Sequence, residues 1–176
     1  MTIPLPSACS AALLAATFGL AFAGDAQALT RQRRFFQNAT GTCQSALPVF
    51  DGQIRKRPLA LQNEGTTSAF VSCSLMGPNS SAVDIILIQV FADNSTATPV
   101  ALTCTLITGL SKFGTPQSLP KTITMPANSG VNGFVWTRAD NGGAPFNNFT
   151  INVSCNLPVG TGLSGMSVTF DEDVGA

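Results

Sequence analysis

The stretch that decides the fold is FTINVSCNL, residues 149–157, in which polar and apolar side chains alternate. A second stretch, VALTCTL at residues 100–106, alternates in the same way, with Cys104 on its apolar side. Successive side chains of a β-strand point to opposite faces of the sheet, so a period of two indicates a strand with one buried face. Both stretches are therefore predicted to be strands whose cysteines, Cys104 and Cys155, point into a core.

Similar strand-length segments follow one another along most of the chain. We expect eight of them, at residues 59–63, 68–75, 83–92, 99–108, 121–125, 131–138, 149–157 and 166–171. Clusters of Gly, Pro, Asn, Asp and Ser separate them, as turns require. The pattern predicts an all-β fold, a single β-sandwich of immunoglobulin-like or jelly-roll type with about eight short antiparallel strands, preceded by a signal peptide.

The first 28 residues have the features of a cleavable export signal. An apolar run covers residues 11–23, which is too short to cross a hydrocarbon core of about 30 Å as a permanent helix. Small residues then predict cleavage after Ala28, with Ala23 as the alternative position. We expect a secreted or periplasmic protein without a transmembrane span. The expected organisation is a signal peptide over 1–28, a basic irregular N-terminal segment over 29–57, and a β-sandwich domain over 58–176.

Four cysteines remain after such a cleavage, namely Cys43, Cys73, Cys104 and Cys155. An even number in an oxidising compartment favours disulfides, and no spacing matches the CxxC of a zinc or redox site, so we expect no metal. Four cysteines allow three connectivities. Cys104 and Cys155 both face the core, whereas Cys43 lies in a segment that needs tethering, so the predicted pairs are Cys43–Cys73 and Cys104–Cys155.

The charges divide unevenly along the chain. Residues 29–57 carry six basic side chains against Asp51 alone, and the chain ends in the acidic run Asp171-Glu172-Asp173. The basic segment is expected to pack beside the acidic end or to be solvated, with an anionic surface as the sharper alternative. Nine basic and nine acidic residues in total leave no bulk field for nucleic acid, so none is expected as a partner. A calcium site at the acidic run is an alternative without the matching loop motif.

The chain contains no His and no Tyr. Imidazole-dependent nucleophiles, His-ligated zinc and imidazole general bases are therefore excluded. A carboxylate-dependent polysaccharide hydrolase is a weak alternative that would use Glu64, Asp84 or Asp140, although nothing in the sequence brings two of them together. We expect a protein that is not an enzyme and has no cofactor.

Two further features bear on binding. Trp136 alternates with Phe134 and is expected in the core, while an exposed Trp136 would instead offer a binding platform for a sugar or peptide. Residues 121–125 are expected at an exposed sheet edge, where a partner strand could add.

Several stretches resemble a group of uncharacterised exported proteins of Gram-negative bacteria. They include CQSALP at residues 43–48, AFVSCSL at 69–75, VSCNLP at 153–158 and the terminal acidic run. The resemblance implies export and a four-cysteine all-β domain, and it brings no assigned activity. The leading functional hypothesis is a disulfide-stapled binding or structural module, whose partner is an envelope component, a glycan or a protein. The alternative is a pilus-like subunit that assembles by strand exchange.

Overall fold

The computed structural model describes residues 29–78, 83–110 and 115–175. The export signal expected at residues 1–28, with its cleavage position Ala28, lies outside this part of the chain. The described residues form eleven strands and three short helical turns, and none of their helices is long and apolar enough to span a membrane. The elements are β1 (Thr30–Asn38), α1 (Ala39–Thr42), β2 (Cys43–Ser45), η1 (Pro48–Phe50), β3 (Ile54–Lys56), β4 (Leu61–Asn63), β5 (Ala69–Leu75), β6 (Asp84–Asn94), β7 (Val100–Thr108), β8 (Gln117–Met125), β9 (Ser129–Thr137), η3 (Arg138–Asn141), β10 (Ile151–Leu157) and β11 (Thr161–Asp173).

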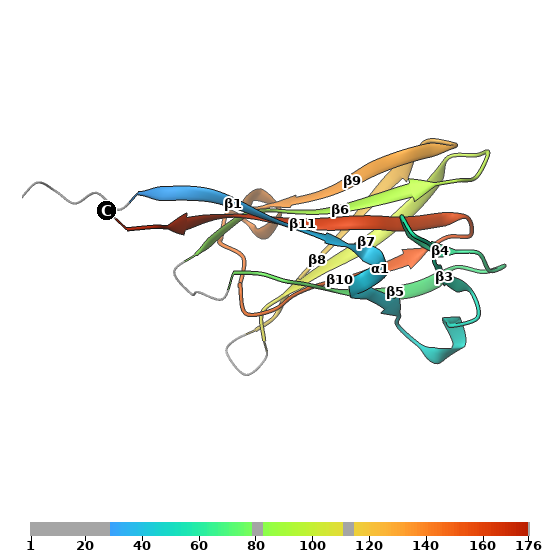
Figure 1. The fold of residues 1–176 in the computed structure, drawn as a ribbon, viewed down its shortest axis with the longest axis horizontal. Coiled ribbons are helices and arrows are strands. Elements are labelled where there is room, and N and C mark those ends of the chain that lie inside the picture. Colours follow the sequence, from blue (N-terminus) through green and yellow to red (C-terminus); the bar gives the residue numbers. More distant parts are fainter. Residues whose placement is uncertain (1–28, 79–82, 111–114, 176) are drawn as a thin grey trace, which may run out of the picture.

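The strands form two antiparallel sheets that pack as a sandwich (Figure 1). Sheet A has the order β3-β4-β11-β6-β9, and β1 also pairs with β11. Sheet B has the order β2-β5-β10-β7-β8. The all-β sandwich predicted from the alternating pattern is confirmed.

One hydrophobic core lies between the sheets. In β5 and β10 every second residue is buried, as the period of two requires. Phe134 and Trp136 are both fully buried on β9, and their rings stack with centroids 5.6 Å apart. The two aromatic rings contribute large buried surfaces to a core that is otherwise mostly aliphatic.

The long strand β11 is the centre of sheet A. It pairs with β6 on one side, and on the other side with β4 and then with β1. Cross-strand partners share a face of the sheet. Because Val168 on β11 is buried in the core, its neighbour Ser167 and the partners of Ser167, Phe36 and Gln89, belong to the outer face.

The prediction of an irregular basic segment over residues 29–57 is wrong. β1 pairs with β11 over nine residue pairs, and β2 and β3 join the edges of sheets B and A. The segment is therefore part of the sandwich, and the boundary expected at residue 58 is not seen. The pattern gave no signal because none of the nine residues of β1 is buried. Its two phenylalanines are adjacent, so they fall on opposite faces.

Both disulfides lie within sheet B. Cys43 on β2 is bonded to Cys73 on β5, and Cys104 on β7 is bonded to Cys155 on β10. Each joins residues that lie directly opposite each other on neighbouring strands, with Cα atoms 4.0 and 4.1 Å apart. These pairs are the ones expected from the sequence. They link strand to strand within one sheet rather than one sheet to the other.

The edge strands of the two sheets meet at β8 and β9. Trp136 Nε1 on β9 donates a hydrogen bond of 3.0 Å to the carbonyl of Leu119 on β8. In the opposite direction, Lys121 Nζ on β8 donates to the carbonyl of Val135 on β9. The same ammonium lies 2.6 Å from Asp140 Oδ1 in η3. The seam between the sheets is therefore closed by side chains that bond the backbone of the opposite sheet.

Candidate functional site

The outer face of sheet A carries a row of small residues along β11. Gly162, Gly165, Ser167 and Thr169 are all buried, although they belong to the outer face. Larger side chains from the flanking strands β1, β4 and β6 cover them. This surface, from Gln62 and Asp93 at one end to Arg34 and Leu87 at the other, is here called the A face.

Two phenylalanines form an aromatic plate at the middle of the A face. Phe36 on β1 is 63% exposed, and its ring lies against Gly165, where an added Cβ would come within 2.7 Å of the Phe36 ring. The ring of Phe91 on β6 lies 5.9 Å from that of Phe36, tilted by 35°. Glycine at 165 therefore lets the Phe36 ring lie on the backbone of the sheet while much of the ring stays open to solvent.

Beside the plate, Arg34 is fixed in a hydrogen-bond network. Its Nη2 donates to Gln89 Oε1 at 2.8 Å and to Ser167 Oγ at 3.0 Å. Ser167 Oγ also donates to Gln89 Oε1 at 3.2 Å. The guanidinium is thus oriented by neutral groups, and within the described residues it makes no ion pair with a carboxylate.

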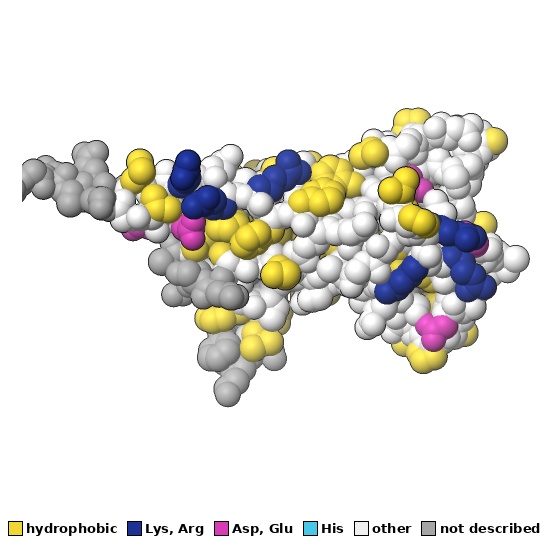
Figure 2. Space-filling model, viewed as in Figure 1, with side chains coloured by type: hydrophobic (Ala, Val, Ile, Leu, Met, Phe, Trp, Pro, Cys, Tyr) yellow, Lys and Arg dark blue, Asp and Glu magenta, His cyan; other side chains and the backbone are white. Residues whose placement is uncertain are grey.

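A hollow of about 560 Å³ opens at this end of the A face. Its polar lining consists of Arg33, Arg34, Arg138, Gln32, Gln89, Thr137 and Thr169, and its apolar lining of Ile86, Leu87 and Ala139. No carboxylate of the described residues lines it. Figure 2 shows basic side chains next to hydrophobic ones over strands β1, β11 and β6.

The opposite end of the A face carries a carboxylate. Asp93 on β6 accepts a hydrogen bond of 3.3 Å from Gln62 Nε2, and both side chains lie over Gly162. Burial raises the pKa of Asp93, although the Gln62 hydrogen bond acts in the opposite direction. The A face is therefore polar at both ends. Gln62 and Asp93 lie at one end, Arg34 and Gln89 lie at the other, and the aromatic plate lies between them.

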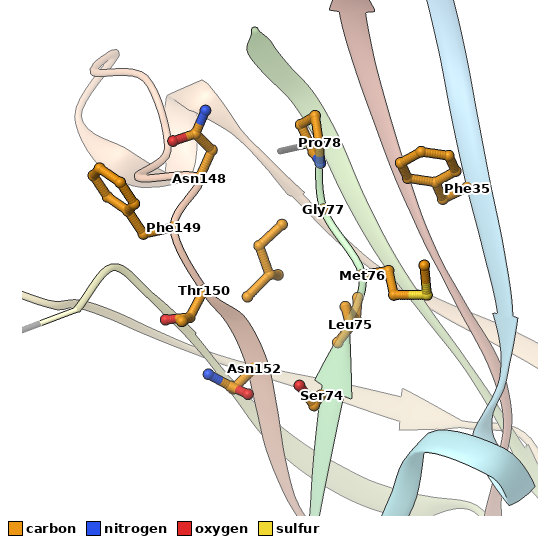
Figure 3. Close-up of a pocket in the computed structure, with 11 residues that line it drawn as sticks. Phe35, Ser74, Leu75, Met76, Gly77, Pro78, Asn148, Phe149, Thr150 and Asn152 are labelled. Carbon is orange, nitrogen blue, oxygen red and sulfur yellow. The ribbon is translucent and has the colours of Figure 1, made fainter. Parts of the chain in front are cut away.

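A second cavity, of about 490 Å³, lies where β5 and β10 separate beyond their last pair, Leu75 and Ile151 (Figure 3). Phe149 borders it on one side and Phe35 and Met76 on the other, as Figure 3 shows. Phe35 packs against the buried Phe170 with ring centroids 5.0 Å apart, although 39% of Phe35 remains exposed. The polar groups at this cavity come from Ser74, Asn148, Thr150 and Asn152. No ionisable side chain lines it.

Trp136 is not a binding platform. The sequence left this open as the lesser alternative to a core position, but the side chain is fully buried and its indole nitrogen bonds the Leu119 carbonyl. A ligand therefore cannot reach the ring. The most exposed aromatic residue in the described part of sheet A is instead Phe36, which sequence reasoning missed together with Arg34.

The signal that could have found these two residues was the dense run of arginines followed by two phenylalanines at residues 31–36. Two adjacent phenylalanines fit a strand that is covered on only one face, because one ring then points to the covered face and the other to solvent. Propensity alone could not place the run, because its partner strand β11 is more than a hundred residues away in sequence.

The carboxylates considered for hydrolysis each have a basic partner. Glu64 bonds Arg57 at 2.6 Å, Asp84 pairs with Arg138, and Asp140 pairs with Lys121. The Arg57 hydrogen bond lowers the pKa of Glu64, and the Lys121 hydrogen bond lowers the pKa of Asp140. A general acid needs the opposite shift, so Glu64 and Asp140 are poorly suited to donate a proton to a leaving group.

The acidic end of the chain packs beside the basic segment. Arg33 Nε on β1 lies 3.0 Å from Glu172 Oε2 on β11, as the register between the two strands brings them close. This confirms the expectation that the basic start and the acidic end are neighbours. The described residues contain no group of three or more acidic, Cys or His side chains placed to hold a metal ion.

The edge expected at residues 121–125 is indeed the end of sheet B, since β8 pairs only with β7. Its neighbourhood is nevertheless occupied: the Leu119 carbonyl is bonded by Trp136, and Lys121 reaches across to β9. At Leu119 and Lys121 these side chains stand where an added strand would have to pair. The structure therefore gives no support to strand exchange at this edge.

Comparisons with known proteins show similarity of shape only. No protein-family model matches the chain, and no curated protein matches it in sequence. Similar solved structures include a Podospora anserina GH26-CBM35 β-(1,4)-mannanase (7% identity, 78% of this chain and 28% of that chain, TM-score 0.46). They also include the C-terminal CBM6 of LamC, a marine laminarinase from Zobellia galactanivorans (11%, 78% and 99%, 0.47). A third is carbohydrate-binding module CBM36 in complex with calcium and xylotriose (13%, 78% and 98%, 0.35).

The chain spans under a third of the length of the mannanase, and likewise of an exo-β-1,3-galactanase from Phanerochaete chrysosporium that covers 77% of this chain. With TM-scores below 0.5 and identities of 7–13%, these likenesses carry no argument about ligand or activity.

Proposed function

We propose that this chain is an exported, non-catalytic binding module whose A face holds a polysaccharide. The observation that carries the proposal is the exposed Phe36 ring, which lies against Gly165 and is flanked by hydrogen-bonding side chains. A sugar ring presents an apolar face of C–H groups and a rim of hydroxyls. An aromatic ring beside fixed donors and acceptors complements both parts.

The length of the A face suits an extended chain of sugars. Along β6 the outward residues run from Leu87 through Gln89 and Phe91 to Asp93, a distance of about 20 Å at the rise of a β-strand. A ligand lying along the strands would meet polar groups, the aromatic plate and polar groups again. Such an array favours a linear polymer over a small globular ligand.

Rigidity supports a binding role. The A face is built on strands of one sheet, and its central strand β11 is paired on both sides. Arg34 and Gln89 are held by bonds to each other and to Ser167. Side chains that are oriented before binding lose less conformational entropy when a ligand arrives.

The module acts outside the cytoplasm in this proposal. Two disulfides in the folded chain are typical of an oxidising compartment, and the expected signal over residues 1–28 supplies the route. The acids weighed for hydrolysis have basic partners, which favours binding without catalysis.

Affinity gel electrophoresis tests the proposal. The protein is run through native gels that contain neutral polysaccharides (xylan, mannan, β-glucan, galactan) or acidic ones (polygalacturonate, alginate). We expect at least one polymer to retard the wild type and F36A to abolish that retardation, because stacking on an aromatic ring is lost.

The matched control is F70A. Phe70 is 46% exposed on β5 of sheet B, away from the A face. F70A removes the same type of side chain as F36A, but from sheet B. It should therefore keep the wild-type retardation. The proposal fails if no polymer in the set retards the wild type, or if F36A and F70A behave alike.

A further inference from the structure

We propose that the hollow around Arg34 binds the carboxylate of an acidic sugar unit, so that the A face prefers a uronic-acid polymer over a neutral one. The inference rests on the proposed function, because it assigns the ligand class to the same face. It adds a specific charged contact that the aromatic plate alone does not require.

The lining of the hollow is rich in positive charge. Three arginines line it, and in the part of the chain that the structure describes no carboxylate does. Arg33 is neutralised by Glu172 and Arg138 by Asp84, both from outside the lining. Of these three arginines, only Arg34 makes no ion pair with a described carboxylate, and an anion of the ligand would complete the pair.

Arg34 has hydrogen-bond donors that no other described residue uses. Its Nη2 is used by Gln89 and Ser167, whereas Nε and Nη1 bond no other described residue. The two bonds hold the guanidinium in place through Nη2. Both bidentate edges of a guanidinium include Nη2, so Nε and Nη1 each remain available for a single bond to a carboxylate oxygen. Hydrogen bonds from a charged donor to a carboxylate are stronger than neutral ones.

Arg34 lies close to the aromatic plate. Phe36 is two residues from Arg34 on the same face of β1, a separation of about 7 Å along a strand. The C6 carboxylate of a uronic acid projects from the edge of its ring. A sugar ring stacked near Phe36 can therefore extend this group towards Arg34.

The Asp93 end of the A face disfavours a second acidic sugar unit. Asp93 is a carboxylate whose burial raises its pKa, and no basic side chain is bonded to it in the described part of the chain. Above that pKa its charge repels a ligand carboxylate. An acidic polymer is thus expected to bind with an acidic unit at Arg34 and with the hydroxyls of another unit at Asp93 and Gln62.

Two-dimensional NMR of the 15N-labelled protein tests the inference at Arg34 itself. The Arg34 Nε–H and the Gln89 side-chain amide are followed during titration with sodium glucuronate, the methyl ester of glucuronate, glucose and sodium acetate. We expect saturable shifts with glucuronate. The ester and glucose should bind about tenfold or more weakly, since the charge-assisted bond is missing. Acetate should also bind more weakly, since it lacks the sugar ring.

Three variants separate the charge from the fold. R34Q removes the cation, and Q89E places a carboxylate beside Arg34 while keeping an oxygen that accepts its hydrogen bonds. Both should abolish the preference for glucuronate over its ester. R31Q removes a charge from the same strand at a residue that does not line the hollow, and it should keep the preference.

Equal midpoints for glucuronate and its methyl ester would overturn the inference, as would shifts that acetate reproduces in full or a preference that survives in both R34Q and Q89E. Absence of a saturable shift up to about 100 mM glucuronate, far weaker than useful recognition, would also overturn it. These outcomes differ from failure of the proposed function. A neutral polymer retarded through Phe36 would uphold polysaccharide binding and reject the acidic preference. Glucuronate binding at Arg34 without retardation by any polymer would uphold the contact with an acidic sugar and reject polysaccharide binding.

Discussion

The indole nitrogen of Trp136 bonds the carbonyl of Leu119 at 3.0 Å, so a core residue of sheet A satisfies a backbone acceptor on the edge strand of sheet B. The ring is fully buried and also stacks on Phe134. Lys121 makes the reciprocal bond, from β8 to the Val135 carbonyl. The seam between β8 and β9 therefore holds the sandwich closed on one side.

Replacing Trp136 by Phe tests this seam. W136F keeps an aromatic ring but removes the indole donor and part of the volume, leaving the Leu119 carbonyl without this partner. We expect the free energy of unfolding to fall by about 2 to 4 kcal/mol, from the lost hydrogen bond and the cavity together. Urea denaturation followed by far-ultraviolet circular dichroism measures it, because the variant has no Trp for fluorescence.

The control for this measurement is V131A on the same strand. Val131 is 70% exposed, so its truncation should change the unfolding free energy by no more than about 0.5 kcal/mol. If W136F unfolds at the same urea concentration as V131A, the seam does not stabilise the fold in the way described.

The pH dependence of stability should reveal the Lys121–Asp140 pair. The hydrogen bond from Lys121 lowers the pKa of Asp140 in the folded state, and the Thr137 backbone N–H contributes to the same effect. A carboxyl whose folded pKa lies below its unfolded value, about 3.9, stabilises the protein above that value. The contribution is lost as the pH falls through the folded pKa. D140N should therefore flatten the loss of stability below about pH 4.

Asp93 provides a comparison of opposite sign. Burial raises its pKa, so the folded state holds this proton more tightly than the unfolded state does. Its contribution therefore declines as the pH rises from about 4 through the folded pKa, and D93N should remove that decline. Chemical denaturation across the pH range from 2 to 7, an interval of roughly the carboxyl titrations, checks both variants. Parallel curves for wild type, D140N and D93N would contradict both assignments.

Substitution of Gly165 tests the aromatic plate without touching Phe36. In G165A the new Cβ would lie 2.7 Å from the Phe36 ring and 3.1 Å from the Gln37 carbonyl oxygen, so the ring has to shift away from its place over residue 165. We expect weaker retardation by polysaccharide and a loss of about 1 to 3 kcal/mol in stability from overpacking. Affinity electrophoresis and urea denaturation measure the two effects.

Gly133 on β9 is the matched control, since an added Cβ there meets nothing within 4 Å. G133A should keep both the retardation and the stability. A G165A protein that binds as tightly as G133A would show that the position of the Phe36 ring is unimportant for recognition.

The disulfides should contribute to stability independently of binding. Replacing either pair by serines is expected to lower the free energy of unfolding by about 2 to 4 kcal/mol. The Cys104–Cys155 pair should cost slightly more, because it closes 51 residues of chain rather than 30. Retardation by polysaccharide should survive at a temperature where the variants are folded, since both pairs lie in sheet B.

Peptide mapping under non-reducing conditions checks the connectivity that this prediction assumes. Cys43 should be recovered only with Cys73, and Cys104 only with Cys155. A peptide that joins Cys43 to Cys104 or to Cys155 would contradict the register of β2 against β5.

Most of the architecture could be predicted from local patterns. All eight expected strands correspond to strands of the sandwich, within a few residues at their ends. Phe134 and Trp136 lie in the core as their shared face indicated. Alternation succeeds in such cases because it depends only on the period of the strand and on which face is buried. It failed for β1, where Phe35 faces the core side and Phe36 faces solvent.

The sequence by itself determined the strands with one buried face and the cysteines that belong in the core, because side-chain direction along a strand follows from local backbone geometry. Only the tertiary structure decided where the candidate site lies. Arg34 and Phe36 meet Ser167 and Gly165 through the pairing of β1 with β11, and they meet Gln89 and Phe91 through the pairing of β11 with β6. These contacts depend on the register between segments up to 133 residues apart. No local pattern specifies that register, since it is set by the packing of the whole sheet against the core.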